Sequence, residues 1–266
     1  MSNSYLLIVR AGDRSLHAGW LNGARNWDLH ISYYDEREEP FALGDGVTMS
    51  REGGPKWHGV QECLAAHPQF LERYSHIGFP DDDLACSAAG WNTTFHVLDE
   101  IGADLGQPAL DPRSFFSYDI TLQRRSLKYR ETDFVELMCP IFRVEFLRAV
   151  MPTLSLNNSS WGLDMAWRQI AQREGRKLAI VDAACVLHTR AVGKGSQYGD
   201  VNMNGQTPET EYRALLASRG ITDTSRHSLR GVALDGTPVS RGINRHLRWA
   251  GLRRNWRSWR GTETVS

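Results

Sequence analysis

The sequence has few cysteines, and their arrangement excludes the usual roles of cysteine clusters. Its four cysteines, at positions 63, 86, 139 and 185, are scattered and share no CxxC spacing. Most of them lie among apolar or small residues, as in Met138-Cys139-Pro140. This pattern indicates buried free thiols in a reducing compartment rather than disulfides or a zinc site. We therefore expect a cytoplasmic protein.

Long hydrophobic runs and an excess of charge are missing as well. The longest apolar runs, such as Tyr5–Val9, are far shorter than the segment of about 20 residues that is needed to cross a bilayer. The N-terminus has no basic stretch before that run, so it does not have the pattern of a secretory signal. The 31 Lys and Arg residues balance 31 Asp and Glu residues. Overall charge therefore does not indicate nucleic acid as a partner.

Over the first two thirds of the chain, short apolar segments alternate with helical patterns. This alternation predicts an α/β fold with a largely parallel sheet flanked by helices. The expected strands are Tyr5–Val9, Asp28–Tyr34, His76–Phe79, Phe134–Pro140 and Lys177–Leu187. The expected helices are Trp57–Tyr74, Thr93–Leu105, Arg143–Met151 and Leu163–Glu174. Pro68 and Pro152 are expected to break or end helices, because proline lacks the amide that the next turn needs.

The last part of the chain has a different composition. Residues 193–208 are rich in Gly, Ser, Asn and Thr, which indicates a loop or lid. From Gly236 to Thr262 there is no acid, but seven arginines surround Trp249, Trp256 and Trp259. Without those arginines and Glu263, the rest of the chain keeps 24 basic and 30 acidic residues, a formal net charge of −6. We expect three parts: a catalytic domain over 1–196, a loop and linker over 197–235, and a basic tail over 236–266.

Two partners are plausible for this basic tail. Arginines among tryptophans suit an anionic membrane surface, where Trp settles at headgroup depth. Such attachment would place the protein peripherally on the inner face of the cytoplasmic membrane. Alternatively, the tail docks on the acidic body of the same protein. Nucleic acid is the weaker option, because that body is acidic.

Three adjacent carboxylates follow an expected strand. Asp81, Asp82 and Asp83 come directly after the apolar segment that ends at Phe79. Hard cations such as Mg²⁺ and Mn²⁺ prefer oxygen ligands, and open parallel sheets bind ligands beyond the carboxyl ends of their strands. The position therefore favours a metal site. An Asp-rich turn or a helix cap is the structural alternative.

Two further stretches contain side chains that could take part in catalysis or ligand binding. Trp161-Gly162-Leu163-Asp164 leads into a helix, so Asp164 is either a general base at the mouth of the sheet or an acid placed by the helix dipole. An apolar strand ends in His188, followed by Arg190 and a loop with Lys194. The imidazole suits a metal shell and the cations suit phosphate, whereas a structural role is the alternative for a lone histidine.

The order of these stretches resembles the plan of GT-A glycosyltransferases, in which an Asp-x-Asp motif precedes a catalytic acid and a metal-binding histidine. The closer resemblance is to the domain of unknown function 707 family, a GT-A-like branch, and it covers roughly residues 5–196. The motifs that carry it are Lys56-Trp57, the segment from Tyr74 to Asp83, Gln107–Leu110, Phe134–Pro140, Trp161–Asp164 and Val181-Asp182 followed by His188.

The resemblance implies a donor site at the acidic triplet. Asp81 and Asp83 would hold Mn²⁺ or Mg²⁺ against the diphosphate of a nucleotide sugar, with Asp82 nearby and His188 as the third protein ligand. The first strand and its turn, with Arg10 and Gly12, would line the nucleotide pocket. The cations Lys56, Arg190 and Lys194 would lie near the donor, and the latter two would add to the stabilisation of the leaving diphosphate.

The resemblance also implies a reaction. Asp164 would deprotonate an acceptor hydroxyl in an inverting transfer, and Glu136 is a second candidate acid. Only one acid stands at the helix start, where an acidic pair is common. The acceptor is expected to be a glycan or a lipid-linked glycan. A metal-dependent nucleotidyltransferase or sugar-phosphate hydrolase, and a non-catalytic binding protein on the same fold, are the alternatives.

Overall fold

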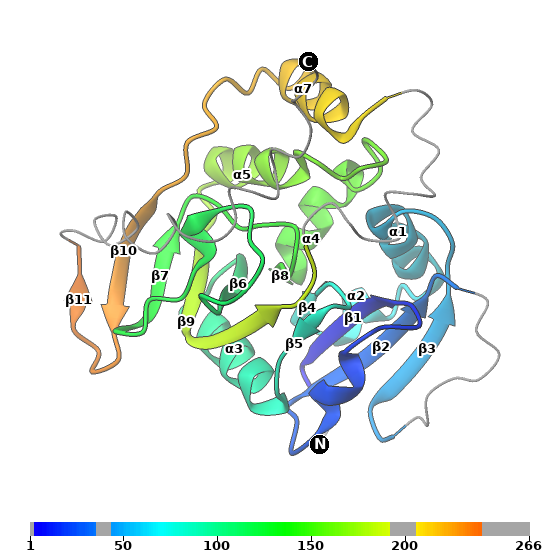
Figure 1. Cartoon of the computed structure of the whole chain (residues 1–266), viewed down its shortest axis with the longest axis horizontal. Coiled ribbons are helices and arrows are strands. Elements are labelled where there is room, and N and C mark those ends of the chain that lie inside the picture. Colours follow the sequence, from blue (N-terminus) through cyan, green and yellow to red (C-terminus); the bar gives the residue numbers. More distant parts are fainter. Residues whose placement is uncertain (1–2, 36–43, 192–205, 241–266) are drawn as a thin grey trace, which may run out of the picture.

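The computed structural model describes residues 3–35, 44–191 and 206–240. Short strands alternate with helices in this part of the chain (Figure 1). The strands are β1 Tyr5–Ala11, β2 Trp27–Tyr33, β3 Val47–Arg51, β4 His76–Gly78, β5 Leu84–Ala85, β6 Leu105–Leu110, β7 Leu127–Thr132, β8 Ile141–Arg143, β9 Leu178–His188, β10 Ser228–Ala233 and β11 Pro238–Val239. The α-helices are α1 Lys56–Ala66, α2 Phe70–Arg73, α3 Ala88–Glu100, α4 Val144–Val150, α5 Leu163–Glu174 and α7 Pro208–Ser218. Short 3₁₀ helices, η1 His17–Leu21, η2 Asp119–Thr121 and η3 Met151–Thr153, occur between them.

One mixed sheet runs through the molecule. Its strand order is β11-β10-β7-β9-β6-β8-β4-β1-β2-β3, and β5 pairs with β9 beside this path. Strands β3, β2, β1 and β4 are parallel neighbours, and β6 is parallel to β9. Strand β8 is antiparallel to both β4 and β6, which it joins. The predicted parallel core is therefore confirmed, with antiparallel strands between and beyond its two halves.

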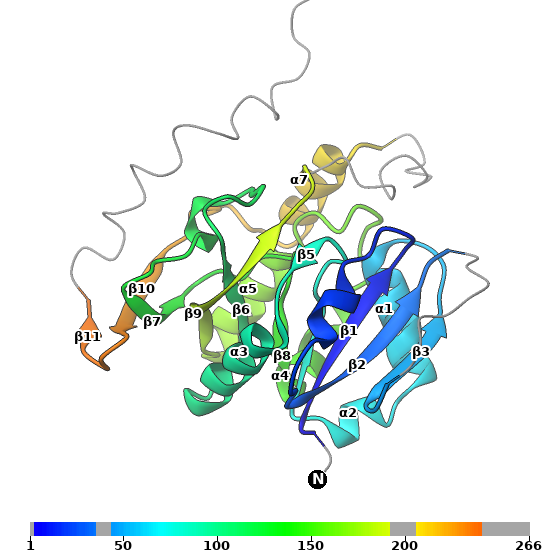
Figure 2. The same ribbon diagram turned by 60° about the horizontal axis from the view of Figure 1, so that its bottom comes forward.

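Helices cover both faces of the sheet, as Figures 1 and 2 show. Side chains alternate across a strand, so Leu6 and Ile8 of β1 join one core cluster and Leu7 and Val9 join another. The first cluster packs against α1, α4 and α5, and the second packs against η1 and α3. Burial on both faces explains why β1 is almost continuously apolar. Strand β2 is buried on both faces as well, but polar residues occupy every second position in it.

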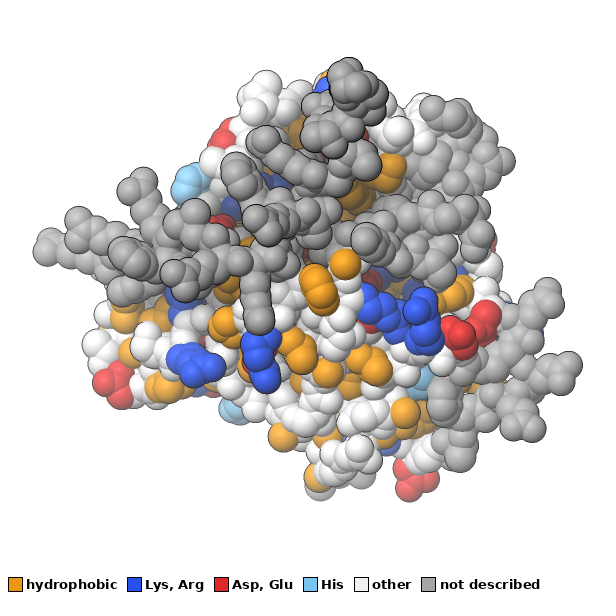
Figure 3. Space-filling model, in the orientation of Figure 1, with side chains coloured by type: hydrophobic (Ala, Val, Ile, Leu, Met, Phe, Trp, Pro, Cys, Tyr) orange, Lys and Arg blue, Asp and Glu red, His pale blue; other side chains and the backbone are white. Residues whose placement is uncertain are grey.

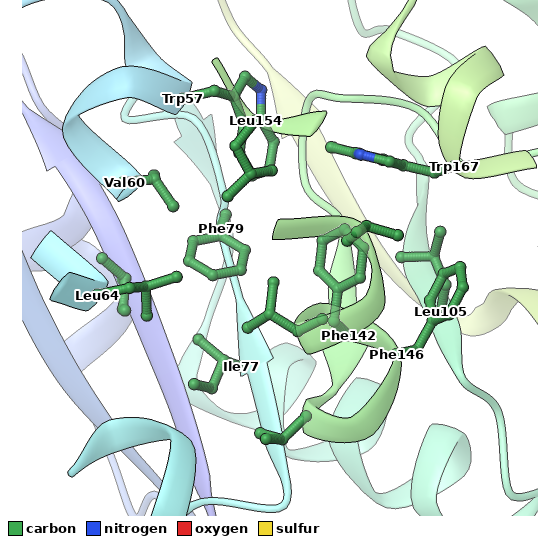
Figure 4. Packing of buried hydrophobic residues seen from close by; sticks show 14 of the residues in the cluster. Trp57, Val60, Leu64, Ile77, Phe79, Leu105, Phe142, Phe146, Leu154 and Trp167 are labelled. Carbon is green, nitrogen blue, oxygen red and sulfur yellow. The ribbon is translucent and has the colours of Figure 1, made fainter. Parts of the chain in front are cut away.

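An aromatic cluster fixes the elements that carry the candidate residues (Figure 4). The rings of Trp57 and Phe79 lie 5.4 Å apart, and those of Trp57 and Trp167 lie 4.8 Å apart. Phe142 packs on the rings of both Phe79 and Trp167. Trp57 follows the candidate Lys56, Phe79 precedes the acidic triplet, and Trp167 is one turn beyond Asp164. A single core therefore supports all three parts of the candidate site.

The predicted strand Phe134–Pro140 is wrong, although its residues are buried. Phe134, Val135 and Cys139 have almost no exposure, yet the segment is irregular and lies outside the sheet ladder. It runs beside the end of β4, where the amide of Asp81 donates to the carbonyl of Met138. The apolar run reflects burial of a connecting segment, which hydrophobicity alone does not distinguish from a strand.

The predicted helices are correct in kind, and some boundaries differ. Helix α5 agrees with its predicted bounds, and Pro68 separates α1 from α2 as expected. Pro152 lies in η3, directly after α4 ends. Helix α3 begins earlier than predicted because the Ser87 side chain accepts a hydrogen bond from the amide of Gly90 and caps its first turn.

The segment predicted as a loop and linker contributes regular structure where it is described. Thr207 and Thr210 form a capping box at the start of α7, with Pro208 in its first turn. Strand β10 then pairs antiparallel with β7, so this part of the chain belongs to the main sheet. The tail beyond residue 240 and Lys194 lie outside the described residues. Within the described ranges, no helix has the length and apolar character needed to span a membrane.

Candidate active site

The three aspartates after β4 have different partners. Asp81 pairs with the Nζ of Lys56, the first residue of α1, at 2.5 Å from its Oδ1. The same ammonium group donates to the carbonyl of Leu137 at 2.9 Å. Burial raises the pKa of Asp81, the Lys56 charge lowers it, and the nearby Asp83 charge raises it. Lys56 therefore holds Asp81 against the irregular segment that passes beside β4.

Asp82 connects the end of β1 with the end of β9. Its Oδ2 accepts from the amide of Gly12 at 3.1 Å and from the hydroxyl of Tyr34 at 3.4 Å. Its Oδ1 pairs with Arg190 Nη1 at 3.1 Å. A Cβ on Gly12 would lie 2.3 Å from Tyr34 Oη, so the Tyr34 side chain would have to shift to admit any larger residue here. Burial raises the pKa of Asp82, against the opposing effects of the Gly12 amide and the Arg190 charge.

Arg190 extends this connection to the loop after β1. Its Nη2 donates to the carbonyl of Arg14, and the Oδ1 of Asp82 binds its other terminal nitrogen. In Figure 3, blue Lys and Arg side chains lie beside red acidic side chains over the region where β1 ends. The predicted pocket residues Gly12 and Arg190 are therefore brought together at Asp82.

Asp83 is paired with the predicted histidine. The antiparallel β5–β9 ladder places Leu84 opposite His188, and this brings His188 Nε2 to 3.2 Å from Asp83 Oδ2. The other ring nitrogen, Nδ1, lies 2.7 Å from the carbonyl oxygen of Phe115. Burial lowers the pKa of His188, but the hydrogen bond and charge of Asp83 more than offset it and raise the pKa to about 9.

The Asp83–His188 pair fits a divalent cation. A carbonyl that accepts from Nδ1–H leaves Nε2 as the ligand atom, which is the usual outer support of a metal-binding histidine. Asp83 Oδ1 is buried, and no described residue hydrogen-bonds to it. Mg²⁺ and Mn²⁺ sites need only one or two carboxylates when phosphates and waters supply the other ligands. Within the described ranges, no group of three or more His, Cys, Asp or Glu side chains is placed to hold a metal ion, and Asp81 is paired with Lys56.

Two buried acids form a second group. Asp164 is in the first turn of α5 and is 4% exposed, and its Oδ1 accepts from the amide of Met165 at 2.8 Å. Burial raises the pKa of Asp164 to about 6, although the charge of Arg226 and backbone hydrogen bonds lower it. Glu136 is 5% exposed, and no described residue bonds to its buried Oε2. Burial, followed by the charge of Asp164, raises the pKa of Glu136 to about 7.

The structure brings these two groups together. Glu136 lies near enough to the end of the sheet that carries Asp83 and His188 for the charges of His188 and Asp81 to act on its pKa. Gln107 of β6 fixes the backbone at this point, because its Oε1 accepts from the Glu136 amide at 2.7 Å. Raised pKa values in paired buried acids are typical of catalytic sites.

Arg10 is the last residue but one of β1, and its guanidinium is occupied by partners within the protein. It is 3% exposed, its Nη1 donates to Ser32 Oγ at 2.7 Å, and its Nη2 donates to the carbonyls of Gly53 and Gly54. Glu52 neutralises its charge, with 3.7 Å between Nη1 and Oε2. The guanidinium therefore fastens the loop before α1 to the sheet. Its predicted contact with a nucleotide stays a prediction.

Sequence reasoning missed several residues that complete the site. Tyr34, the carbonyl of Phe115 and Arg226 contact or act on Asp82, His188 and Asp164 respectively. None of them belongs to a recognisable spacing pattern. Each reaches the site through strand pairing or loop packing between segments that are distant in the sequence.

Comparison with known proteins defines the fold. No family model matches the chain, and no curated protein matches it. Among solved structures, S. aureus TarS 1-349 in complex with UDP-GlcNAc is similar over 84% of this chain and 68% of its own length, with a TM-score of 0.53 and 11% identity. GalNAc-T7 with UDP, GalNAc and Mn²⁺ is similar over 82% of this chain, with a TM-score of 0.56 and 12% identity. The chain spans 48% of that GalNAc-T7 chain.

These likenesses show that the chain has the GT-A fold, a Rossmann-type sheet flanked by helices. The predicted fold class is thereby confirmed.

Proposed function

We propose that the protein is a metal-dependent glycosyltransferase. It would move a sugar from a nucleotide-diphosphate donor to a hydroxyl acceptor, a glycan or a lipid-linked glycan, with inversion. The observation that carries the proposal is the Asp83–His188 pair, with its orphaned buried carboxylate oxygen, beside two buried acids at one end of a GT-A sheet. Membership of the domain of unknown function 707 family is part of the same proposal.

Asp83, His188 and Arg190 form the part of the proposed site that would bind the nucleotide-sugar donor. Asp83 and His188 would hold Mn²⁺ or Mg²⁺, which neutralises charge on the departing diphosphate when bound. Arg190 lies at the end of β9 within reach of the same region, and it would exchange its contact with Asp82 for the diphosphate. Both neighbouring structures were solved with uridine nucleotides, and GalNAc-T7 also with Mn²⁺. This supports a nucleotide-sugar donor for the present chain.

Asp164 and Glu136 form the part of the proposed site that would bind the acceptor. Asp164 is the base in the proposal: it takes the proton of the acceptor hydroxyl as that oxygen bonds to the anomeric carbon. The bond from that carbon to the donor phosphate breaks, and its electrons leave with the nucleoside diphosphate. Glu136 would orient the acceptor by a hydrogen bond. Attachment to a membrane through the tail, on the cytoplasmic side, remains a proposal.

The test is a thermal-shift panel of nucleoside diphosphates and nucleotide sugars, with and without Mn²⁺. A ligand that binds the native state raises apparent stability with the logarithm of its concentration over its dissociation constant. The expected result is a shift that requires both Mn²⁺ and one nucleotide, is lost in Asp83→Ala and persists in Asp235→Ala, a change in the turn between β10 and β11. No shift with any nucleotide would contradict a donor site. A shift without sugar transfer to any acceptor would favour a hydrolase, a nucleotidyltransferase or a binding protein.

A further inference from the structure

A buried carboxylate of α7 binds the loop that precedes Asp164. Helix α7 lies beside α5 (Figure 1), and Glu211 in its first turn is 7% exposed. Its Oε2 accepts from the amide of Ser159 at 2.7 Å, and its Oε1 accepts from the amide of Asn158 at 3.2 Å. One ionisable side chain therefore holds two successive amides of the 157–161 loop, and hydrogen bonds to a carboxylate are stronger than those between neutral groups.

The rest of this loop is fixed by its own side chains. The amide of Trp161 donates to Ser159 Oγ at 3.3 Å, and the side-chain amide of Asn157 donates to the Trp161 carbonyl at 2.8 Å. Ser159 thus bonds to Glu211 through its backbone and to Trp161 through its hydroxyl. The position of Trp161 therefore depends on the contact between Ser159 and α7.

The loop leads directly into the helix that carries Asp164. The carbonyl of Ser160 accepts from the amide of Leu163, the first residue of α5, at 3.2 Å, and Asp164 follows. At Gly162 the chain again approaches α7, because a Cβ there would lie 3.1 Å from Leu215. A movement of the loop away from α7 would therefore displace the first turn of α5.

The backbone of the loop is strained. Ser160 has φ +69°, and among the described residues it is the only one other than glycine with a positive φ. This conformation is disfavoured for a residue with a Cβ. Such strain persists only where the surrounding contacts determine the conformation, and it is concentrated at functional sites. The two bonds to Glu211, directly before Ser160, are contacts of this kind.

We propose that Glu211 is a positioning residue for the acceptor side of the site. It holds the 157–161 loop in its strained conformation and thereby sets the place of Asp164. The proposal rests on the proposed function, in which Asp164 takes the proton of the acceptor hydroxyl. It also assigns α7, which composition marks as part of a loop and linker, to the site.

The first readout is hydrogen exchange of individual amides, measured by nuclear magnetic resonance in ¹⁵N-labelled protein. In Glu211→Ala the amides of Asn158 and Ser159 lose their acceptors. Each should exchange roughly tenfold to a hundredfold faster than in the wild type, as expected for the loss of a hydrogen bond to a charged group. In Glu211→Gln only one side-chain oxygen can accept, so one of the two amides should keep its protection and the other should lose it.

The second readout is the ¹⁹F resonance of Trp161 in protein labelled with 5-fluorotryptophan, assigned by its loss in Trp161→Phe. It should shift in Glu211→Ala, because Ser159 connects the Trp161 amide to the carboxylate. A general loss of stability would lower the midpoint of unfolding and leave this resonance of the folded state in place. The readout therefore separates positioning of the loop from support of the fold.

The matched control is Glu209→Gln. Glu209 is also in the first turn of α7, but it pairs with the exposed Arg213 at 2.9 Å. Both amides and the Trp161 resonance should behave as in the wild type. Unchanged exchange at both amides in a folded Glu211→Ala protein would overturn the proposal. If that variant does not fold, loss of protection at one amide in Glu211→Gln supports the proposal, and full protection at both overturns it.

The nucleotide panel separates this proposal from the proposed function. Glu211→Gln should keep the Mn²⁺-dependent nucleotide shift and lower the rate of sugar transfer by about tenfold or more, because small misplacements of a reacting group are costly in rate. Equal loss of both would give Glu211 a general structural role and overturn the proposal. A panel without any shift would remove the glycosyltransferase assignment, while the exchange data would still report whether Glu211 holds the loop.

Discussion

His188 and Asp83 connect two distant parts of the chain through their side chains, with 3.2 Å between His188 Nε2 and Asp83 Oδ2. Their backbones are fixed by the β5–β9 ladder, and Thr189 adds a hydrogen bond from its hydroxyl to the Asp83 carbonyl at 2.8 Å. The backbones of the two residues are therefore fixed by main-chain contacts as well as by the contact between their side chains.

His188→Ala should weaken Mn²⁺ binding by at least about tenfold, since loss of an outer supporting group alone costs 10–100-fold in affinity. Isothermal titration calorimetry with Mn²⁺ measures the change directly. His96→Ala is the matched control, because His96 is an exposed residue of α3. Equal affinities in all three proteins would remove His188 from the metal site.

Lys56→Met should strengthen Mn²⁺ binding, because the ammonium group that occupies Asp81 is removed and Asp81 becomes available as a ligand. The same titration measures it, with Lys128→Met as a control for the loss of a lysine that pairs elsewhere. Asp81→Asn tests the prediction that Asp81 is itself a metal ligand. Weaker binding in that variant would make Asp81 a ligand, and unchanged binding would restrict it to its role as the partner of Lys56.

Glu136→Gln should stabilise the protein at pH 8 and leave its stability at pH 5 nearly unchanged. The pKa of Glu136 is raised to about 7 in the folded protein, mainly by burial. The folded state therefore holds its proton more tightly than the unfolded state, and stability falls as the pH rises from the unfolded pKa through 7. Removing the ionisable group removes this loss, about 3 kcal/mol at high pH.

Urea unfolding at several pH values checks the expectation for Glu136. Glu145→Gln is the control, because Glu145 is an exposed residue of α4. A variant with the same pH dependence as the wild type would show that Glu136 does not carry the buried proton.

Gly162→Ala should destabilise the protein by about 2–5 kcal/mol, from left-handed backbone strain and overpacking together. Gly162 has φ +92°, and a Cβ there would meet Leu215 at 3.1 Å and Tyr212 at 3.2 Å. Gly175→Ala is the control, because its φ is +65° and a Cβ there meets nothing within 4 Å. Chemical denaturation should give the larger loss for position 162. An equal loss at both positions would remove the packing contribution of α7.

The sequence was informative where a pattern is local. The strand before the triplet, the helix that opens at Leu163 and the proline breaks all follow from periodicity and backbone chemistry. The placement of His188 beside Asp83 agrees with the order of motifs in the resemblance, and the structure brings the two together. Their assignment as metal ligands stays a prediction.

Long-range features were beyond the sequence. The pairing of Lys56 with Asp81 depends on where α1 starts relative to β4, which no spacing rule gives. Arg226 comes from a region that composition marks as a linker, and the neighbouring backbone is fastened to α5 by Arg168. The strand predicted over Phe134–Pro140 was wrong because a buried connection and a buried strand have the same hydrophobicity.

The pairing of β5 with β9 has a consequence for biosynthesis. Strands β1 to β4 and helix α1 are synthesised early, and the parallel half of the sheet requires only them. Asp83 is synthesised before its partner His188, and Asp164 is synthesised before Arg226, which follows later still. A nascent chain therefore contains the acidic turn before it contains the histidine that pairs with it. In the proposed function, sugar transfer can therefore begin only after β9 has been synthesised and has paired with β5.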